Sequence, residues 1–195
     1  MLFICSCKEN IHEQIVLGEK EVTSNIIEVK EVLLEELSFE KERGLLYDGN
    51  HLFTGIAVKY YTNDTLAEKT HYINGLKDGL KQKWYEDGLL SFETLYNRGL
   101  QDGIAKSWWK NGNLRSKAQF NQGIVNGTQY QWYRNGNKFK EINIVNGKEE
   151  GMQKSWRENG KIYNNYEARN GRIFGLKRSK LCFKLDNENL EITTL

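Results

Sequence analysis

The glycines of this 195-residue chain lie on a 24-residue lattice, which restricts its fold more than any other feature of the sequence. Fourteen of the 18 glycines fall into three series with this step: positions 75, 99, 123, 147 and 171; 79, 103, 127, 151 and 175; and 88, 112, 136 and 160. Trp84, Trp108, Trp132 and Trp156 keep the same step. Since such a fixed period marks stacked repeats, we predict an array of one weak first copy, four strong copies and a final half copy.

Each copy is predicted to contain two strands and two turns. In residues 75–98, the turn signal Asp87-Gly88 separates two segments of about seven residues, which are too short for stable helices. The second segment alternates as Leu90, Phe92, Thr94 and Tyr96, the period of a strand. The absence of proline fits, because proline would remove a donor from the strand ladder. The expected fold class is all-β: an elongated, open-ended antiparallel sheet of stacked β-hairpins.

The length of the hairpin loop decides which residues share a face. A two-residue loop would place Trp84 opposite Ser91, with Phe92 on the face of Tyr85, whereas a three-residue loop with a glycine bulge would place Trp84 opposite Phe92. We favour the second pairing because it gathers the apolar side chains on one face: Leu80, Trp84, Leu90, Phe92 and Tyr96. Trp84, Trp108, Trp132 and Trp156 are then the predicted core of the repeats.

The repeat resembles a known family. The pattern of Gly75, Gly79, Trp84-Tyr85, Gly88 and Leu90 is similar to the MORN repeat variant of bacterial proteins of the YwqK-type antitoxin family, and the resemblance covers residues 44–185. It implies an elongated sheet of stacked hairpins that serves as an interaction surface, with no catalytic residues to carry over. It also implies that the partner is a toxin.

The N-terminal residues suggest a lipid anchor. Met1–Cys7 resembles the end of a bacterial lipoprotein signal, with Cys7 as the acylated residue, although its apolar core is shorter than usual. We therefore predict a location in the cell envelope, with the cytoplasm as the alternative. The expected organisation is a leader or tether over residues 1–43, with a signal remnant at 1–7, the repeat array over 44–185, and a tail or edge cap over 186–195.

The near-neutral total charge of +2 hides two opposite segments. Residues 8–43 hold ten acids and five bases, whereas residues 44–183 hold 22 bases and 13 acids. The array is therefore a candidate docking surface for an anionic partner or membrane, or a strand surface whose charges are simply solvated. Within the acidic segment, residues 28–42 fit either a short amphipathic helix through Val29, Leu33 and Leu37 or a first strand near Leu37–Glu42.

No constellation of catalytic residues is apparent. His12, His51 and His71 follow neither the repeat nor a metal-ligand spacing, and no phosphate loop or G-x-S-x-G motif is present. Cys182 reads as a packed thiol in a closing strand at Leu181–Leu185. We predict a chain that is not an enzyme and that needs neither a cofactor nor a metal.

The predicted function is a protein-interaction module, with the antitoxin or immunity partner of a toxin as its specific form. The predicted contact residues are aromatic and basic, the types that dominate binding energy: Tyr85, Trp109, Tyr133, Arg157, Lys106, Lys110 and Arg134. Replacing Trp109 and Tyr133 with Ala is expected to weaken capture of the partner with little change in melting. The alternative is a lipid-anchored envelope protein whose basic sheet faces the membrane; nucleic acid is not expected as a partner.

Overall fold

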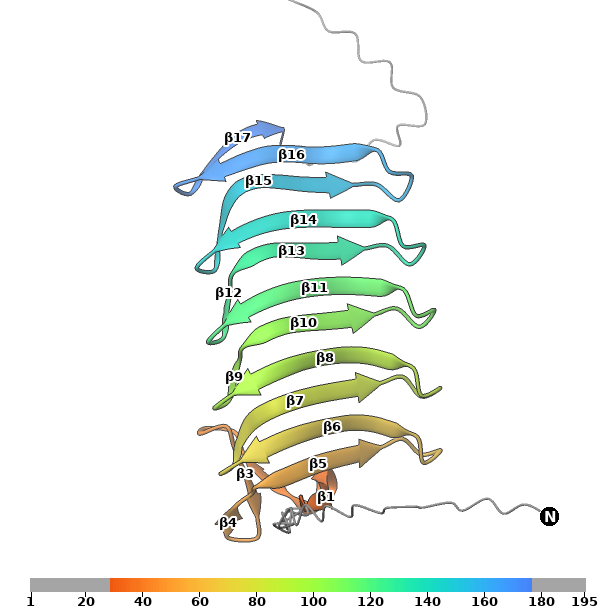
Figure 1. Cartoon of the computed structure of the whole chain (residues 1–195), viewed down its shortest axis with the longest axis vertical. Coiled ribbons are helices and arrows are strands. Elements are labelled where there is room, and N and C mark those ends of the chain that lie inside the picture. The colour runs from red at the N-terminus through yellow and green to blue at the C-terminus, as the bar shows by residue number, and fades with distance from the viewer. Residues whose placement is uncertain (1–28, 177–195) are drawn as a thin grey trace, which may run out of the picture.

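The chain forms one elongated sheet of fourteen strands with a small three-stranded sheet at its N-terminal end (Figure 1). The structure is a computed structural model that describes residues 29–176. From β5 (Gly55–Tyr60) onward, strands that follow one another in the sequence are antiparallel neighbours, except that the short β9 (Leu100–Gln101) and β12 (Ile124–Val125) each pair only with the strand before them and lie off this path. The predicted all-β sheet of stacked hairpins is thus confirmed, with one addition: a parallel strand at the N-terminal edge makes the sheet mixed.

The N-terminal part contains β1 (Glu31–Leu33), the 3-10 turn η1 (Leu34–Glu36), β2 (Ser38–Glu40), β3 (Leu45–Asp48) and β4 (His51–Leu52). The array begins with β5 (Gly55–Tyr60), β6 (Leu66–Ile73), β7 (Leu76–Trp84) and β8 (Leu90–Asn97). It continues with β9 (Leu100–Gln101), β10 (Gly103–Trp108), β11 (Leu114–Asn121), β12 (Ile124–Val125) and β13 (Gly127–Trp132). The last described strands are β14 (Lys138–Val145), β15 (Lys148–Trp156), β16 (Ile162–Arg169) and β17 (Arg172–Leu176).

The Asp87-Gly88 hairpin corrects the predicted pairing. Its loop has three residues and a glycine bulge, since Tyr85 donates to the Leu89 carbonyl at 2.8 Å and Gly88 has a φ of 82°. Trp84 therefore lies opposite Leu90, and a second irregularity, between Lys83 and Trp84, then pairs Lys83 with Phe92. The predicted opposition of Trp84 and Phe92 is therefore wrong, and these two aromatic residues lie on opposite faces of the sheet.

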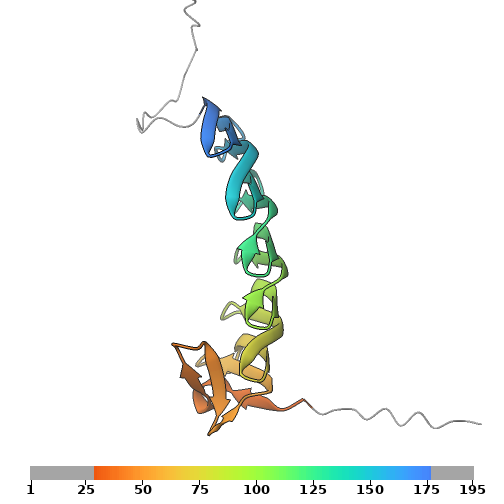
Figure 2. The same ribbon diagram turned by 90° about the vertical axis from the view of Figure 1, so that its left-hand side faces the viewer.

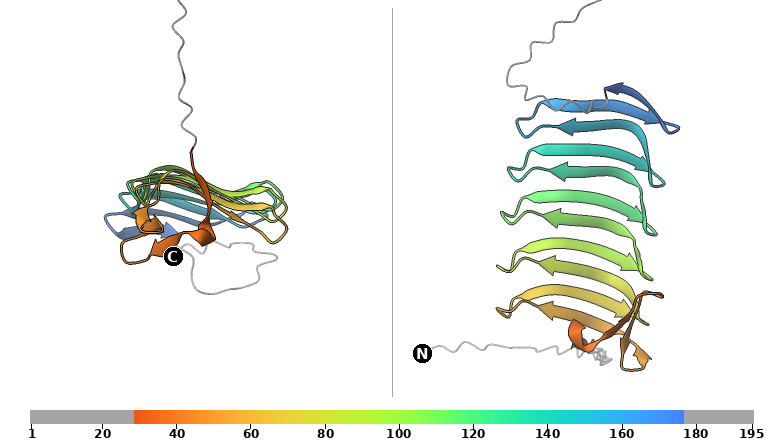
Figure 3. Two further views of the ribbon diagram at one scale, coloured as in Figure 1. Left: turned by 90° about the horizontal axis from the view of Figure 1, so that it is seen from below. Right: turned by 180° about the vertical axis from the view of Figure 1, so that it is seen from behind.

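The second of the two turns predicted in each copy lies on the other long edge of the sheet and is a hairpin too. Asn74 and Gly75 both have positive φ, 50° and 77°, the conformation of a two-residue type I′ turn. Each such turn bonds to the copy before it: the Gly99 amide donates to the Lys77 carbonyl at 2.7 Å. Turns of both kinds therefore line the two long edges of the sheet (Figure 3).

The array is one layer thick, as the narrow column in Figure 2 shows. Its two faces differ in burial. One, which we call the packed face, contains most of the buried residues of the array: Thr70, Tyr72, Thr94, Ala105, Gln153, Ser155, Tyr166 and Ala168. The other, which we call the tryptophan face, contains Trp84, Trp108, Trp132 and Trp156, each of them half-buried.

The N-terminal end of the array is capped. Strand β1 pairs parallel with β5, and a hydrophobic cluster joins the small sheet to the array through Leu46, Phe53, Ala57 and Tyr72. Residues 28–42 therefore contribute a strand at Ser38–Glu40 and a single 3-10 turn, which matches the strand alternative. The predicted leader thus supplies β1, η1 and β2 to the folded end of the array.

Several predictions concern residues outside those that the structure describes. They are the lipidation of Cys7, the signal remnant at 1–7, the closing strand at Leu181–Leu185 with Cys182, and the tail at 186–195.

Candidate functional site

The tryptophan face presents three parallel rows of side chains across the sheet. The first row runs beside the three-residue loops and alternates large aromatic residues with their cross-strand partners: Trp84 with Leu90, Trp108 with Leu114, Trp132 with Lys138, and Trp156 with Ile162. Successive tryptophans are two strands apart, roughly 10 Å. Because each indole is only half-buried, the row keeps aromatic area at the surface along four copies.

Neighbouring side chains hold the rings of this row in place. The Tyr130 and Trp132 rings stack with their centroids 5.7 Å apart. The Lys138 ammonium lies over both Tyr130, at 5.7 Å, and Trp156, at 5.6 Å. Aromatic and cation–π contacts of this kind fix ring orientation, which lowers the entropy lost when a partner binds.

The second row is polar and charged, with one residue from each strand. Its order across the array is Lys69, Gln82, Glu93, Lys106, Lys117, Tyr130, Glu141, Lys154 and Asn165. Lys106 bonds to Glu93 at 3.3 Å, and Glu141 bonds to Lys138 at 2.9 Å. Within residues 29–176, Lys117 has no ion pair.

The third row, nearer the Asn-Gly edge, exposes large apolar side chains. Leu95 is 46% exposed, Ile104 40%, Met152 42% and Phe174 51%. Leu95, Ile104 and Met152 each lie on the same face as the charged row, two residues along the strand from one of its members. Leu95, for example, is two residues from Glu93, and its cross-strand partner Leu80 is two residues from Gln82. The polar and charged row therefore lies between the tryptophan row on one side and these exposed apolar side chains on the other.

Three of the predicted contact residues connect neighbouring copies. The Tyr85 hydroxyl donates to the Trp108 carbonyl at 2.7 Å, the Trp109 indole to Trp132 at 3.1 Å, and the Tyr133 hydroxyl to Trp156 at 2.9 Å. Tyr61 begins this ladder with a bond to Trp84 at 2.8 Å, a role that the 24-residue step could have revealed. The polar atoms of these rings are thus engaged inside the array.

The surroundings of this ladder also favour a packing role. The Arg115 guanidinium lies 4.7 Å from the Trp109 ring centre, and Phe139 lies 4.9 Å from Tyr133. Burial raises the pKa of Tyr133, with smaller contributions from Tyr163 and Glu158. The role of Tyr85, Trp109 and Tyr133 in partner binding stays a prediction, but their hydrogen bonds to the next copy establish a structural role.

The predicted basic contact residues lie apart from one another. Lys106 is in the charged row, whereas Lys110, Arg134 and Arg157 are exposed at three successive loops. Lys110 pairs with Asp87 of the preceding loop at 3.5 Å. Sequence reasoning missed Lys117, which lies directly opposite Lys106, because only the strand register brings the two together.

Glu68 is a carboxylate that forms ion pairs with two lysines, and its role is structural. Glu68, on the packed face, pairs with Lys81 and with Lys83. Burial raises the pKa of Glu68, but the hydrogen bonds and charges of the two lysines outweigh it, so the pKa lies below its ordinary value. Such a carboxylate is a poor general acid near neutral pH.

Residues 29–176 contain neither a metal-ligand cluster nor a helix that could span a membrane. The described part of the chain brings together no group of three or more metal-ligating side chains. It also contains no helix with the length and apolar character needed to cross a membrane.

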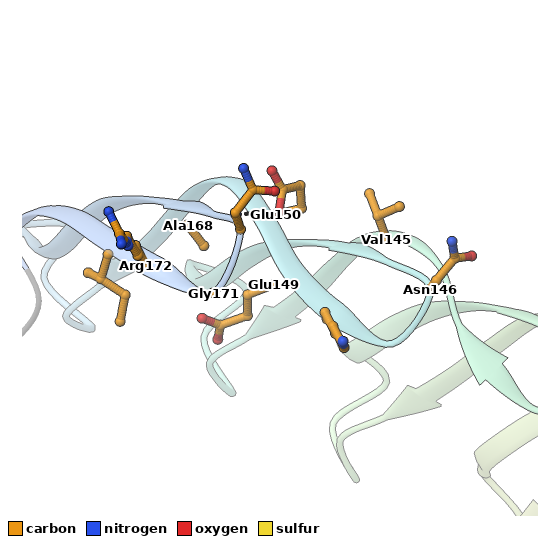
Figure 4. Close-up of a pocket in the computed structure, with 10 residues that line it drawn as sticks. Val145, Asn146, Glu149, Glu150, Ala168, Gly171 and Arg172 are labelled. Carbon is orange, nitrogen blue, oxygen red and sulfur yellow. Dashed lines mark hydrogen bonds between the residues drawn. The ribbon is translucent and has the colours of Figure 1, made fainter.

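A cavity of about 790 Å³ lies near the last described strands (Figure 4). It arises where a contact that repeats between copies is missing. Leu100 packs against Gly123, and Ile124 packs against Gly147. In the next copy the equivalent residue is Lys148, and the space beside the Gly171 Cα is open. Its carboxylates already have partners, since the Tyr166 hydroxyl donates to Glu149 and the Asn170 amide to Glu150. The cavity is therefore a gap in packing more than a prepared ligand site.

The family model of the MORN repeat variant matches the chain at residues 53–74 and 101–122. Both matched segments contain one hairpin, β5 with β6 and β10 with β11, and they begin 48 positions apart, which is two periods of the glycine lattice. The comparison supports the resemblance to this repeat at two of the copies. No curated protein matches the chain.

Proposed function

We propose that this chain is a non-enzymatic interaction module whose tryptophan face binds a protein partner. MORN repeats are generally modules for interaction with proteins or membranes. The observation that carries the proposal is the exposed aromatic and apolar area on one face of a single-layer sheet, which no second layer covers within residues 29–176. Tryptophan, tyrosine and cationic groups are also the side chains that most often dominate binding energy.

The tryptophan face is a better contact surface than the ladder of Tyr85, Trp109 and Tyr133. The ring polar atoms of that ladder already bond to backbone carbonyls, so a partner would gain little from them. Arg134, Arg157 and Lys110 border the tryptophan row at the loops and would form the charged rim of the interface.

The specific form of the proposal is that the partner is a toxin and that this chain is its antitoxin or immunity protein. Its support is the resemblance of the repeat to the antitoxin family. The alternative, a lipid-anchored envelope protein, rests on the sequence around Cys7. Mass spectrometry of the full-length product would detect the acyl group, and its absence would remove the anchor and the envelope location.

Site-directed photo-crosslinking in the native cell tests the binding face. A photoreactive residue at Ile104 or Met152 reports on the tryptophan face, and one at Lys83 or Gln131 reports on exposed positions of the packed face. We expect a defined protein adduct from the first pair only. Adducts from the packed face alone, or adducts to lipid alone, would contradict the proposal.

The identity of the partner then decides the specific form. If expression of the crosslinked protein alone stops growth and coexpression of this chain restores it, the partner is a toxin. Replacement of Trp108 and Trp132 with Ala should abolish both the adduct and the rescue. A partner without toxicity would refute the antitoxin role and leave the interaction module in place.

A further inference from the structure

The charged row of the tryptophan face contains two lysines that oppose each other directly. In the register of β10 and β11, Lys106 and Lys117 are cross-strand partners and their side chains project from the same face. Like charges in this position repel and destabilise a sheet. Lys106 has a compensating bond to Glu93, but Lys117 lies between Lys106 and Tyr130 and is exposed.

The surrounding sequence provides no acid to relieve this repulsion. Residues 103–140 contain no Asp or Glu, and they contain seven cationic residues: Lys106, Lys110, Arg115, Lys117, Arg134, Lys138 and Lys140. The middle of the array is therefore its most cationic part. The cost of the opposed lysines is removed when an anion binds between them.

The cationic part is also bounded. Glu93 precedes Lys106 in the row, and Glu141 follows Tyr130, so acidic side chains face outward on both sides of it. Three strands lie between the strands of these two acids, so the acids are four strand spacings apart, roughly 19 Å. A flat anionic membrane or a long nucleic acid would press its phosphates against both glutamates, whereas a short segment of a protein fits between them.

Apolar side chains flank Lys106 along its own strand, whereas on the strand of Lys117 the partner of Ile104 is Gln119 and the partner of Trp108 is Leu114. Ile104, 40% exposed, is adjacent on one side, and Trp108 is adjacent on the other, each two residues from Lys106 along β10. A segment that presents both carboxylates and apolar side chains would match this pattern.

We propose that Lys106 and Lys117 receive an acidic segment of the protein partner, with its carboxylates between the two ammonium groups and its apolar side chains on Ile104 and Trp108. This inference rests on the proposed function and names the chemistry of the partner. The anion relieves the repulsion between the lysines, so Lys117 contributes more to binding than an exposed lysine elsewhere on the chain.

Fluorescence anisotropy of the full chain tests this directly. The probe is a labelled octapeptide in which every second residue is Leu or Glu in turn, with Ser between them, so that both kinds project from one face of the extended peptide. Its counterpart with Gln in place of Glu, anionic phosphatidylserine vesicles and a single-stranded oligonucleotide are compared with it. We expect the Glu peptide to bind most tightly, with an affinity that falls as salt rises. The substitution Lys117→Glu should weaken it about tenfold, whereas Lys161→Glu, the same change of charge at a loop, should leave it unchanged.

A second readout does not depend on a ligand. Lys117→Gln removes the repulsion without adding a charge, so the urea midpoint of the free chain should rise. A lower midpoint, equal effects of Lys117→Glu and Lys161→Glu, or vesicle or oligonucleotide binding stronger than peptide binding would overturn the inference. If a photoreactive residue at Ile104 still crosslinks to a protein when Lys117 is replaced by Glu, this inference fails and the proposed function stands. If the chain with Lys117 unchanged gives no protein adduct at all, the proposed function is refuted.

Discussion

The hydrogen-bond ladder between copies makes a quantitative prediction about stability. Tyr61, Tyr85 and Tyr133 each donate a hydroxyl proton to a backbone carbonyl of the next copy, at 2.7 to 2.9 Å. Replacing all three with Phe keeps the rings and removes only these bonds. The chain thus offers a test in which packing is almost constant.

The expected loss follows from the geometry. A half-buried hydrogen bond contributes about 1 kcal/mol net, and its loss also leaves a carbonyl without its donor. The three sites lie in different copies, at least roughly 10 Å apart, so their effects should add. The triple variant should therefore lose about 3 kcal/mol of unfolding free energy.

Urea unfolding, followed by tryptophan fluorescence and by circular dichroism, measures this loss. With a slope of about 2 kcal/mol per molar urea, the midpoint should fall by about 1.5 M. Coincident transitions from the two signals are required, because repeat arrays can unfold in stages. Tyr60→Phe is the matched control, since Tyr60 is 43% exposed and belongs to the same copy as Tyr61.

The result that refutes the reasoning is a triple variant within about 0.5 kcal/mol of the parent chain. Water would then satisfy the carbonyls as well as the hydroxyls do. The same reasoning reverses the sequence-based expectation for Trp109 and Tyr133: their replacement with Ala should lower the melting temperature, because both rings bond and pack between copies.

Three further predictions concern stability. Gly75→Ala should destabilise the chain by more than about 2 kcal/mol, because a Cβ would lie 2.9 Å from the Leu46 carbonyl, whereas Gly160→Ala, at a similar φ but in open space, should cost about 1 kcal/mol; equal losses in urea unfolding would refute the steric contribution. Burial raises the pKa of Tyr72 and of Tyr166 from 10.0 to about 12. The unfolded chain therefore ionises first, and the free energy of unfolding should fall as the pH rises from 10 towards 12. In the double Phe variant this free energy should depend less on alkaline pH, and an unchanged dependence would speak against this linkage. The lowered pKa of Glu68 gives stability that is present above its ordinary value of 4.5 and is lost as the pH falls through the lower folded value; Glu68→Gln should remove this part of the acid sensitivity, and a variant with the parent's acid midpoint would show that another carboxylate is responsible.

The period, the strands and the loops of the array follow from local signals in the amino-acid sequence. Glycine positions record a local requirement, a positive φ at a turn, and this requirement repeats whenever the same hairpin repeats. The alternation of Leu90, Phe92, Thr94 and Tyr96 reports the pleat of one strand. Both signals are local, so they can be recognised in the sequence without knowledge of the neighbouring strands.

Which side chains meet depends on the register between strands, and the structure was needed to establish it. A one-residue change of register exchanges the two faces, and the irregularity beside the loop, which pairs Lys83 with Phe92, leaves no mark in the positions of the glycines. Two other contacts depend on strands far apart in sequence: the Tyr85 bond to the next copy and the parallel pairing of β1 with β5. The juxtaposition of Lys106 with Lys117 has the same origin, since it follows from the register of two strands and from no motif in either.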